Sequence, residues 1–184
     1  MKRRFLYKYY THQGDDIGKP LITTTLNGQI ISYTSTESMD FNGSNNVDTG
    51  IQLTYAGGFK IHISGSFPST PNRSDTILNC MNEGDNTYPG FCIRWSSSSC
   101  LKLYYGDESV NSGSDSQLTF DITLIKPANS NSVSLTETTS GSSATCQITF
   151  DNSVSLVVGG SINASGDGQR YATCTITDFS VKIV

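Results

Sequence analysis

Residues 59–67 read FKIHISGSF and alternate apolar with polar side chains along most of their length. The apolar positions are Phe59, Ile61, Ile63 and Phe67, and the polar ones are Lys60, His62 and Ser64. Successive side chains of a β-strand point to opposite faces of the sheet, so this period of two predicts a strand with one core face and one wet face. Such half-wet strands are typical of antiparallel sheets, because strands of buried parallel sheets are apolar throughout.

The same alternation recurs on both sides of this segment. It is found in GFCIRW (90–95), LKLYY (101–105), LTFDITL (118–124) and VSLVV (154–158). Trp95 shares the parity of the apolar positions in its segment, which predicts a core position. In the last segment, CTITDFSVKIV (174–184), the parity slips once near Asp178, and a β-bulge or bend there would keep both halves facing the core. Residues 21–34 predict a hairpin, because two β-prone runs flank Asn27-Gly28.

Composition agrees with these patterns. Val, Ile and Thr number 44, whereas Ala, Leu, Glu and Lys number 27, so residues that favour strands outnumber strong helix formers. A chain of 184 residues is long enough to bury one sizeable core. With Ser-, Gly- and Asn-rich connections between the segments, we predict an all-β, two-sheet antiparallel jelly-roll sandwich over residues 21–184.

Residues 1–20 differ from this body in charge. The formal net charge is −4, but four of the twelve basic residues lie in the first eight positions, leaving eight basic against sixteen acidic residues afterwards. The body is therefore a poor binder of nucleic acid. We interpret residues 1–20 as a basic, aromatic arm that docks on a partner, with residues 4–10 as a further strand as the alternative. The docking candidates are Arg3, Arg4, Phe5, Tyr7, Tyr9 and Tyr10.

Targeting signals and cysteine usage indicate the compartment. The apolar stretch after Lys2-Arg3-Arg4 ends at Lys8, which is too short for a signal peptide, and no apolar run is long enough to span a membrane. The five cysteines are odd in number and include no CxxC pair. We expect buried thiols and assembly in a reducing cytoplasm, with a Cys92–Cys100 disulfide as the alternative.

Four segments together resemble a known superfamily. Residues 39–53, MDFNGSNNVDTGIQL, are followed by the amphipathic segment 59–67, and later by 154–160 and the closing segment 174–184. Their order and spacing are similar to those of the laminin-G/concanavalin A-like lectin superfamily. The resemblance covers residues 39–184 and implies a lectin-like core with a concanavalin A-like fold. That fold hosts lectins, glycosidases, adhesion modules and virion parts, so it does not by itself assign a function.

The basic arm and the Ser/Thr/Asn-rich sandwich also resemble bacteriophage virion surface proteins, including head-fibre, decoration and tail-associated proteins. This resemblance implies a non-enzymatic structural protein of the virion, assembled in the host cytoplasm and docked through its arm. Its partners would be other virion proteins or further copies of the chain, together with cell-surface glycans, without nucleic acid or membrane insertion. The alternatives are a free-standing carbohydrate-binding module and a degenerate glucanase.

Glycan binding requires an exposed aromatic ring beside amide or carboxylate groups. Tyr88, in a loop with Asp85 and Asn86, is the first candidate, and Tyr104, which alternation places opposite Leu103 and Tyr105, is the second. The alternative is that each tyrosine packs on its own surroundings.

The sequence predicts no obligatory cofactor, but it offers clustered oxygen ligands for calcium. The first candidate cluster is Asn82, Glu83, Asp85 and Asn86, and the second is Asp107, Glu108, Asn111 and Asp115. Asp and Asn also favour turns for backbone reasons, so solvated turn residues are the alternative.

No catalytic residues are predicted. Glucanases of this superfamily place three carboxylates on one strand, whereas Glu83-Gly84-Asp85 supplies two and is followed by Asn86, Thr87 and Tyr88. The two histidines, His12 and His62, accompany no nucleophile motif. We therefore expect no enzymatic activity.

Overall fold

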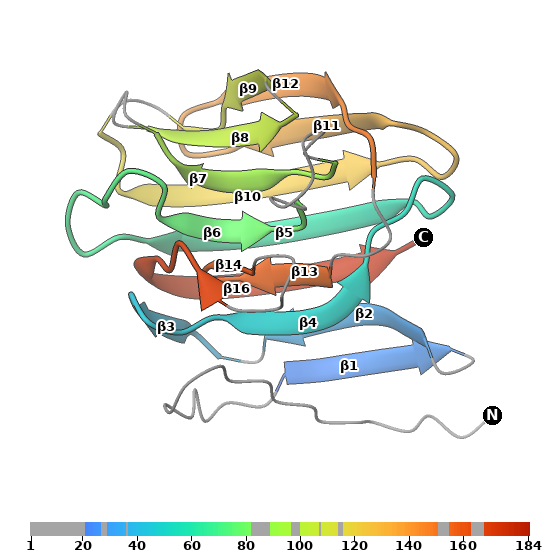
Figure 1. Ribbon diagram of the computed structural model, residues 1–184, viewed down its shortest axis with the longest axis horizontal. Helices are drawn as coiled ribbons and strands as arrows, with labels where there is room; N and C mark the ends of the chain where they lie inside the picture. The colour runs from blue at the N-terminus through green and yellow to red at the C-terminus, as the bar shows by residue number, and fades with distance from the viewer. Residues whose placement is uncertain are drawn as a thin grey trace.

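The computed structural model describes residues 21–26, 29–35, 37–81, 89–96, 100–106, 108–113, 116–150, 155–162 and 168–184. These residues form two large antiparallel sheets that face one another and one small two-stranded sheet (Figure 1). No helix is found among them. The predicted all-β class and two-sheet antiparallel sandwich are therefore confirmed.

The first large sheet has eight strands in the order β1-β2-β16-β5-β10-β11-β12, and β3 pairs with the first half of β16 on the edge opposite β5. Its bounds are β1 Leu21–Leu26, β2 Gln29–Ser35, β3 Met39–Asn42, β5 Phe59–Ser66, β10 Thr119–Lys126, β11 Ser132–Glu137, β12 Ser142–Gln147 and β16 Thr173–Ile183. Residues 59–67 thus lie at the centre of the sheet, between β16 and β10.

The second large sheet has six strands in the order β4-β13-β6-β7-β8-β9. Its bounds are β4 Val47–Gln52, β6 Thr76–Asn79, β7 Cys92–Trp95, β8 Leu101–Tyr105, β9 Glu108–Asn111 and β13 Ser155–Val158. The small sheet pairs β14, Ser161–Ile162, with β15, Gly168–Gln169. The chain crosses between the large sheets repeatedly, as expected for a jelly roll of concanavalin A-like type.

Two local predictions are confirmed by the register of the strands. Leu26 pairs with Gln29, so β1 and β2 form the predicted hairpin with a two-residue connection, although Asn27 and Gly28 lie outside the described residues. In β16 the register shifts between Ile176 and Asp178, where the parity of the sequence slips. Phe179 therefore faces the core and is fully buried.

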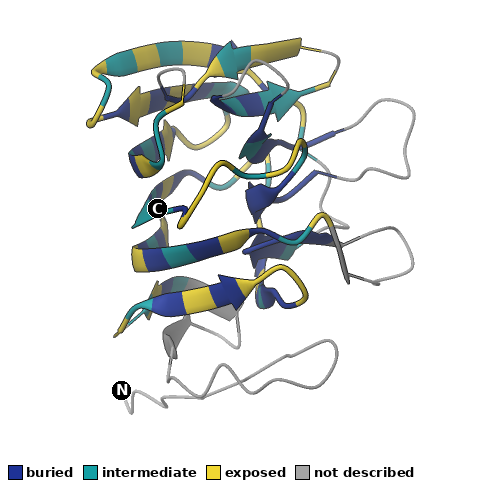
Figure 2. Ribbon diagram, turned by 90° about the vertical axis from the view of Figure 1, so that its left-hand side faces the viewer, coloured by how far each residue is buried: buried dark blue, intermediate teal, exposed yellow. Residues whose placement is uncertain are grey.

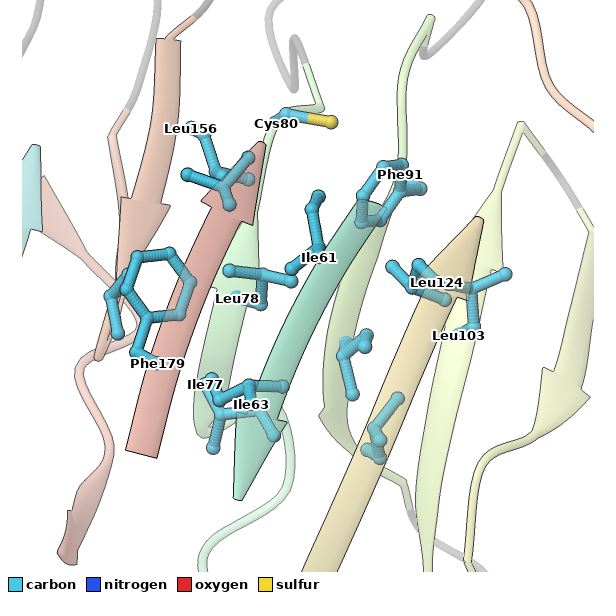
Figure 3. Packing of buried hydrophobic residues seen from close by; sticks show 14 of the residues in the cluster. Ile61, Ile63, Ile77, Leu78, Cys80, Phe91, Leu103, Leu124, Leu156 and Phe179 are labelled. Atoms are coloured by element: carbon cyan, nitrogen blue, oxygen red, sulfur yellow. The ribbon is translucent and has the colours of Figure 1, made fainter. Parts of the chain in front are cut away.

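The core fills the space between the large sheets. Ile61, Ile63 and Leu124 come from the eight-stranded sheet, and Leu78 and Leu103 come from the six-stranded sheet (Figure 3). All five are fully buried. Trp95 is also buried, with its ring edge-on to Phe67 at a centroid distance of 5.5 Å, which confirms its predicted core position.

One expectation is wrong. The alternation in residues 90–95 and 154–158 predicts one wet face for each segment, but β7 and β13 are buried at three of four positions, and their neighbour β6 is buried at all four (Figure 2). Cys92 and Val157, which alternate with core residues, are fully buried on the outer side. Connections cover this part of the sheet. The Asn79 side chain donates a hydrogen bond to the Met81 carbonyl and accepts one from the Met81 N–H, and β14 contacts β6.

The segment 39–53 also differs from the single opening strand that the resemblance suggested. It forms β3 in the eight-stranded sheet and β4 in the six-stranded sheet, with a turn between them. Gly43 has a φ of +84°, which a glycine adopts without strain and which helps the chain cross from one sheet to the other. Phe41 packs against Gly159, where an added Cβ would lie 2.1 Å from its ring.

All five cysteines have free thiols and are buried. Burial raises the pKa of Cys80 and of Cys174 above the ordinary thiol range, so both are poor nucleophiles. Within the described ranges, no helix has the length and apolar character needed to cross a bilayer.

Candidate functional site

A pocket opens at the edge of the sandwich where β9 of one sheet and β12 of the other lie close together (Figure 1). Its volume is about 560 Å³. Ligand pockets in proteins commonly enclose about 300–1,000 Å³. The lining residues are Pro89, Gly90, Tyr105, Gly106, Glu108, Thr145, Cys146, Gln147, Ile148 and Thr149.

One wall comes from the β8–β9 hairpin. Tyr105 at the end of β8 is the register partner of Glu108 at the start of β9, so both side chains lie on the same face. Gly106 follows Tyr105 with a φ of +54°, in the left-handed region that a tight turn requires. The hairpin therefore presents a phenol and a carboxylate to the pocket side by side.

The other wall comes from β12 and the residues after it. Gln147 and Thr145 are exposed, whereas Cys146 and Ile148 are buried against the core. Gly90 closes one end, because its N–H donates to the carbonyl of Thr149 at 2.6 Å. Its φ is +93°, and an added Cβ would lie 2.1 Å from the carbonyl oxygen of Cys80, so only glycine fits there.

The protonation of the pocket follows from its surroundings. Burial raises the pKa of Tyr105 well above its ordinary value, and the hydrogen bond to Glu108 adds to the effect. Burial also raises the pKa of the Cys146 thiol, while a hydrogen bond with Tyr105 opposes this. At neutral pH the pocket thus holds a neutral phenol, a neutral thiol and the Glu108 side chain, which accepts a hydrogen bond from Tyr105.

These groups suit recognition of hydroxyl-rich molecules. Gln147 and the two threonines can donate and accept hydrogen bonds, Glu108 can accept them, and the Tyr105 ring offers an apolar surface. Glycoside hydrolysis normally requires two carboxyl groups on either side of the scissile bond. Among the described residues that line the pocket, Glu108 is the single carboxylate.

Most of the predicted site residues lie outside the described residues. This holds for the glycan candidates Tyr88, Asp85 and Asn86, and for the first calcium cluster, Asn82, Glu83, Asp85 and Asn86. The docking candidates Arg3, Arg4, Phe5, Tyr7, Tyr9 and Tyr10 lie outside them as well. Pro89, which follows Tyr88 in the sequence, is a described residue and lines the pocket.

Tyr104 lies where alternation placed it, on the face opposite Leu103 and Tyr105. It is half-buried on the outer side of the six-stranded sheet, and the Arg94 guanidinium carbon lies 4.1 Å from its ring centroid. The structure therefore does not bring Tyr104 into the pocket that Tyr105 lines.

The second calcium cluster is not assembled in its described part. Glu108 pairs with Tyr105 and Asn111 pairs with Lys102, so β9 directs the two side chains to opposite faces of the sheet. Asp107 and Asp115 lie outside the described residues. Within the described ranges, no group of three or more His, Cys, Asp or Glu residues is arranged to hold a metal ion.

A polar cluster that the sequence did not indicate lies on the outer face of the eight-stranded sheet. His62 Nε2 is 2.8 Å from Asp121 Oδ1, and His62 Nδ1 is 3.2 Å from Asp178 Oδ2. Alternation placed His62 on the polar face, but its partners come from β10 and β16, far away in the sequence. In the sequence, each of these residues could be recognised only as a polar side chain on the outward face of its own strand, with no indication that the three would meet.

Comparison with known proteins identifies the fold. No family model matches the chain, and no curated protein matches it in sequence. NanB in complex with optactamide is similar in structure, with a TM-score of 0.55 and 12% identity over 81% of this chain and 26% of that one. The NanB sialidase from Streptococcus pneumoniae with a chlorobenzyl-ammonio-ethanesulfonate ligand has a TM-score of 0.51 and 8% identity over 80% and 25%. Arcelin-5, a lectin-like defence protein from Phaseolus vulgaris, has a TM-score of 0.41 and 9% identity over 98% and 92%.

The two NanB chains share the sandwich fold with this chain at low sequence identity. The chain spans 26% and 25% of their lengths, so the likeness concerns one part of each sialidase. Together with the strand order, it supports a two-sheet antiparallel jelly-roll sandwich.

Proposed function

We propose that this chain is a non-enzymatic carbohydrate-binding β-sandwich whose glycan site is the pocket between β9 and β12. The observation that carries the proposal is a pocket of about 560 Å³ whose described lining residues include a tyrosine, a glutamate, a glutamine and two threonines. Sugar rings present hydroxyl groups at their edges and apolar C–H groups on their faces, so this mixed lining suits a short oligosaccharide. The sandwich fold shared with part of NanB supports the proposal.

The glycan site is tested by a glycan array followed by titration calorimetry on the full chain. Glu108→Gln should weaken binding about tenfold, because a charge-assisted hydrogen bond becomes a neutral one. Gln147→Ala should weaken it by a similar factor. Both residues are exposed, so neither change threatens the core. Tyr55→Phe, at a tyrosine that does not line the pocket, is the control and should bind as the wild type does.

Two outcomes would contradict the proposal. Absence of any glycan ligand for the wild type, or unchanged affinity of both pocket variants, would exclude the pocket as a glycan site. Repeating the titration with millimolar calcium and with a chelator tests the calcium prediction for Asn82, Glu83, Asp85 and Asn86 at the same time.

The absence of catalysis is part of the proposal. It is supported by the described part of the pocket lining, which supplies one carboxylate where hydrolysis normally needs two. Incubation with β-glucans should release no reducing ends. Hydrolysis by the purified wild type that is lost in Glu83→Gln would instead establish a glucanase.

We infer a second candidate function, a virion surface protein docked through residues 1–20, from the charge distribution. Four of twelve basic residues lie in the first eight positions, while the rest of the chain is acidic. A cationic segment joined to an acidic body favours docking on a larger assembly rather than free diffusion. Deletion of residues 2–10 should abolish incorporation into particles while the far-ultraviolet circular dichroism stays that of a β-protein. Unchanged incorporation into particles would contradict this function and favour a free-standing carbohydrate-binding module.

A further inference from the structure

We propose that the outer face of the eight-stranded sheet binds a second copy of this chain through Lys60, Lys182, Asp121 and Asp178, which together we name the charged outer face. These residues lie on β5, β10 and β16, which are side by side in the sheet (Figure 1). The proposed glycan pocket lies at the edge where β9 meets β12, and β11 separates β12 from β10. The two proposals therefore concern different surfaces.

Strand register brings the two lysines together. Lys60 in β5 is the direct partner of Lys182 in β16, and both are exposed. Phe59 and Ile61, on either side of Lys60, are buried in the core, so the lysines project from the outer side. Among the described residues, neither lysine forms an ion pair with a carboxylate. Like charges directly opposite one another destabilise a sheet, so this pair is unfavourable in the isolated chain.

The same three strands carry two carboxylates further along. Asp121 in β10 and Asp178 in β16 are both register partners of Ser64, which lies between them in β5. Each contacts the His62 ring through one carboxylate oxygen, and their side chains are 43% and 54% exposed. Within the described part of the chain, neither carboxylate forms an ion pair with a lysine or arginine. Both are therefore accessible to a cation from outside.

The lysines and the carboxylates lie at opposite ends of this face. Lys60 and Ser64 are four positions apart in β5, which corresponds to about 13 Å along a strand. His62 lies midway between them, and its register partners are Ser180 in β16 and Thr123 in β10. The face is therefore basic at one end and acidic at the other, with His62 and two hydroxyl side chains in the row between.

A face with this pattern is complementary to a copy of itself. A two-fold axis that runs across the strands, along the row of His62, turns one copy over onto the other and exchanges the two ends. Lys60 of each copy then lies opposite Ser64 of the other copy, between Asp121 and Asp178. Because the interface is isologous, the same contacts form twice. The second copy supplies the carboxylates that the lysine pair lacks.

The shape of the face also suits a second sheet. Its other outward side chains are mostly short and carry hydroxyl groups, for example Ser32, Thr123, Ser134 and Ser180. Short side chains permit the separation of about 10 Å at which two sheets pack face to face.

The size of the face predicts a weak, reversible dimer. The six strands from β2 to β12 in the sheet order, spaced about 4.8 Å apart, make the face about 24 Å wide. The eight residues of β5 make it about 26 Å long. Each copy would bury roughly 600 Å², which is at the lower end of the range for specific interfaces.

The distribution of charge favours a second copy over a polyanion or a polycation. A polyanion would meet the carboxylates and a polycation would meet the lysines, whereas a copy in the two-fold arrangement meets both ends with opposite charge. Lys126 and Glu137, the remaining lysine and glutamate in the strands of this sheet, are buried. Asp40 accepts a hydrogen bond from Thr175 and adds to the acidic end, because Thr175 follows Asp178 outward along β16.

Sedimentation equilibrium of the full chain over a wide range of concentration measures the association. We expect a monomer–dimer equilibrium whose dissociation constant rises with salt, because salt screens exposed charges. Lys60→Glu/Lys182→Glu makes both ends acidic, and Asp121→Lys/Asp178→Lys makes both ends basic. Each double variant should raise the dissociation constant of its own dimer about tenfold or more, because like charges then face one another.

An equimolar mixture of the two charge-reversal variants gives the sharpest test. A heterodimer pairs an acidic face with a basic face, so opposite charges meet at both ends. The mixture should therefore dimerise although each variant alone associates poorly. Lys60→Gln/Lys182→Gln, which removes the charge without reversing it, should weaken the dimer less, so the test does not depend on one variant alone. Circular dichroism checks that every variant is folded.

A matched control reverses two charges away from this face. Arg73, in the segment before β6, and Lys102, in β8, lie outside the eight-stranded sheet and are exposed and half-buried, respectively. Arg73→Glu/Lys102→Glu changes the net charge by the same amount as Lys60→Glu/Lys182→Glu and should dimerise as the wild type does. Net charge alone is thereby separated from the charges of the face.

Three results would overturn the proposal. These are a wild type that stays monomeric over the whole concentration range, unchanged dimers in both charge-reversal variants, or no rescue when the two folded variants are mixed. Glu108→Gln and Gln147→Ala, which change the pocket, should dimerise as the wild type does. Failure of the pocket and failure of the charged outer face are therefore distinguishable.

Discussion

The outer faces of the two large sheets differ although their strands have similar sequences. In the eight-stranded sheet, β10 and β11 alternate between buried and more accessible positions, and the outward side chains include Thr123, Ser134 and Thr136. In the six-stranded sheet, Asn79 and Val157 are fully buried although they face outward. Alternation therefore reports which side chains face the core, but a buried outer face depends on the connections that cover it.

The difference also separates the polar chemistry of the two sheets. On the eight-stranded sheet, His62 and its partners Asp121 and Asp178 are partly exposed to solvent. The same sheet buries one ionisable side chain at the end of β10, Lys126, and one at the end of β11, Glu137. The six-stranded sheet buries uncharged side chains on its covered outer part and leaves Arg94 and Lys102 partly accessible near its β9 edge.

The largest expected effect comes from introducing a charge on the covered face. Val157→Asp should lower the free energy of unfolding by about 3–5 kcal/mol, because it buries a carboxylate without a partner. Thr136→Asp, at an exposed outward position of β11, should cost less than about 1 kcal/mol. Urea unfolding of both variants measures the contrast. Equal costs would mean that the two outer faces are equally hydrated.

Glu137→Gln should have the next largest effect. The carboxylate of Glu137 is fully buried and accepts hydrogen bonds from the N–H groups of Asp121, Thr139 and Ser140. The amide variant loses charge-assisted hydrogen bonds and points its NH2 group at backbone N–H groups that are also donors. The free energy of unfolding, measured with urea, should fall by about 2 kcal/mol. Glu37→Gln, at an exposed position, is the control.

Glu137 also predicts a pH dependence. Burial alone would raise its pKa, but the hydrogen bonds from Ser140, Asp121 and Thr139 outweigh burial and hold the pKa below its ordinary value of 4.5. The stability contributed by the charged form is therefore fully present above that value and is lost as the pH falls through the lowered pKa of the folded state. Urea midpoints of the wild type should fall in this acidic window, and those of Glu137→Gln should fall less.

Lys126→Met should have a smaller effect. The ammonium group is fully buried and donates to the carbonyls of Tyr55, Gly57 and Pro127, and burial lowers its pKa. Methionine has a similar shape and suits the neighbouring rings of Phe59 and Phe150, so the loss should be about 1 kcal/mol by thermal and urea unfolding. A larger loss of unfolding free energy for Lys126→Met than for Glu137→Gln would contradict this ranking of the two buried groups.

The smallest effect is expected at the exposed cluster. His62→Ala removes contacts to Asp121 and Asp178, whose side chains are 43% and 54% exposed. Such surface pairs contribute about 0.5 kcal/mol, and salt screens them. The difference in unfolding free energy between wild type and variant should therefore shrink at high salt. A salt-independent loss would indicate a packing role instead.

The candidate site shows where sequence patterns stop being informative. Alternation placed Tyr104 and Tyr105 on opposite faces, and the predicted glycan loop ends beside the pocket at Pro89. Nothing in the sequence indicated that Glu108 of β9 would line the same pocket as Gln147 of β12 and the later residue Thr149. In the second calcium cluster, residues close in sequence are not all close in space, because β9 sends Glu108 and Asn111 to opposite faces.

The sequence by itself determined the features that depend on neighbouring residues. These are the all-β class, the inward side chains such as Ile61 and Leu103, the hairpin of β1 and β2, and the bulge before Asp178. Each follows from the period of two or from turn chemistry, which act over a few residues. Only the tertiary structure decided which outer face is covered, where β9 meets β12, and which carboxylates His62 contacts. These depend on how the chain crosses between the sheets and pairs strands distant in sequence, and a local pattern contains no information about that pairing.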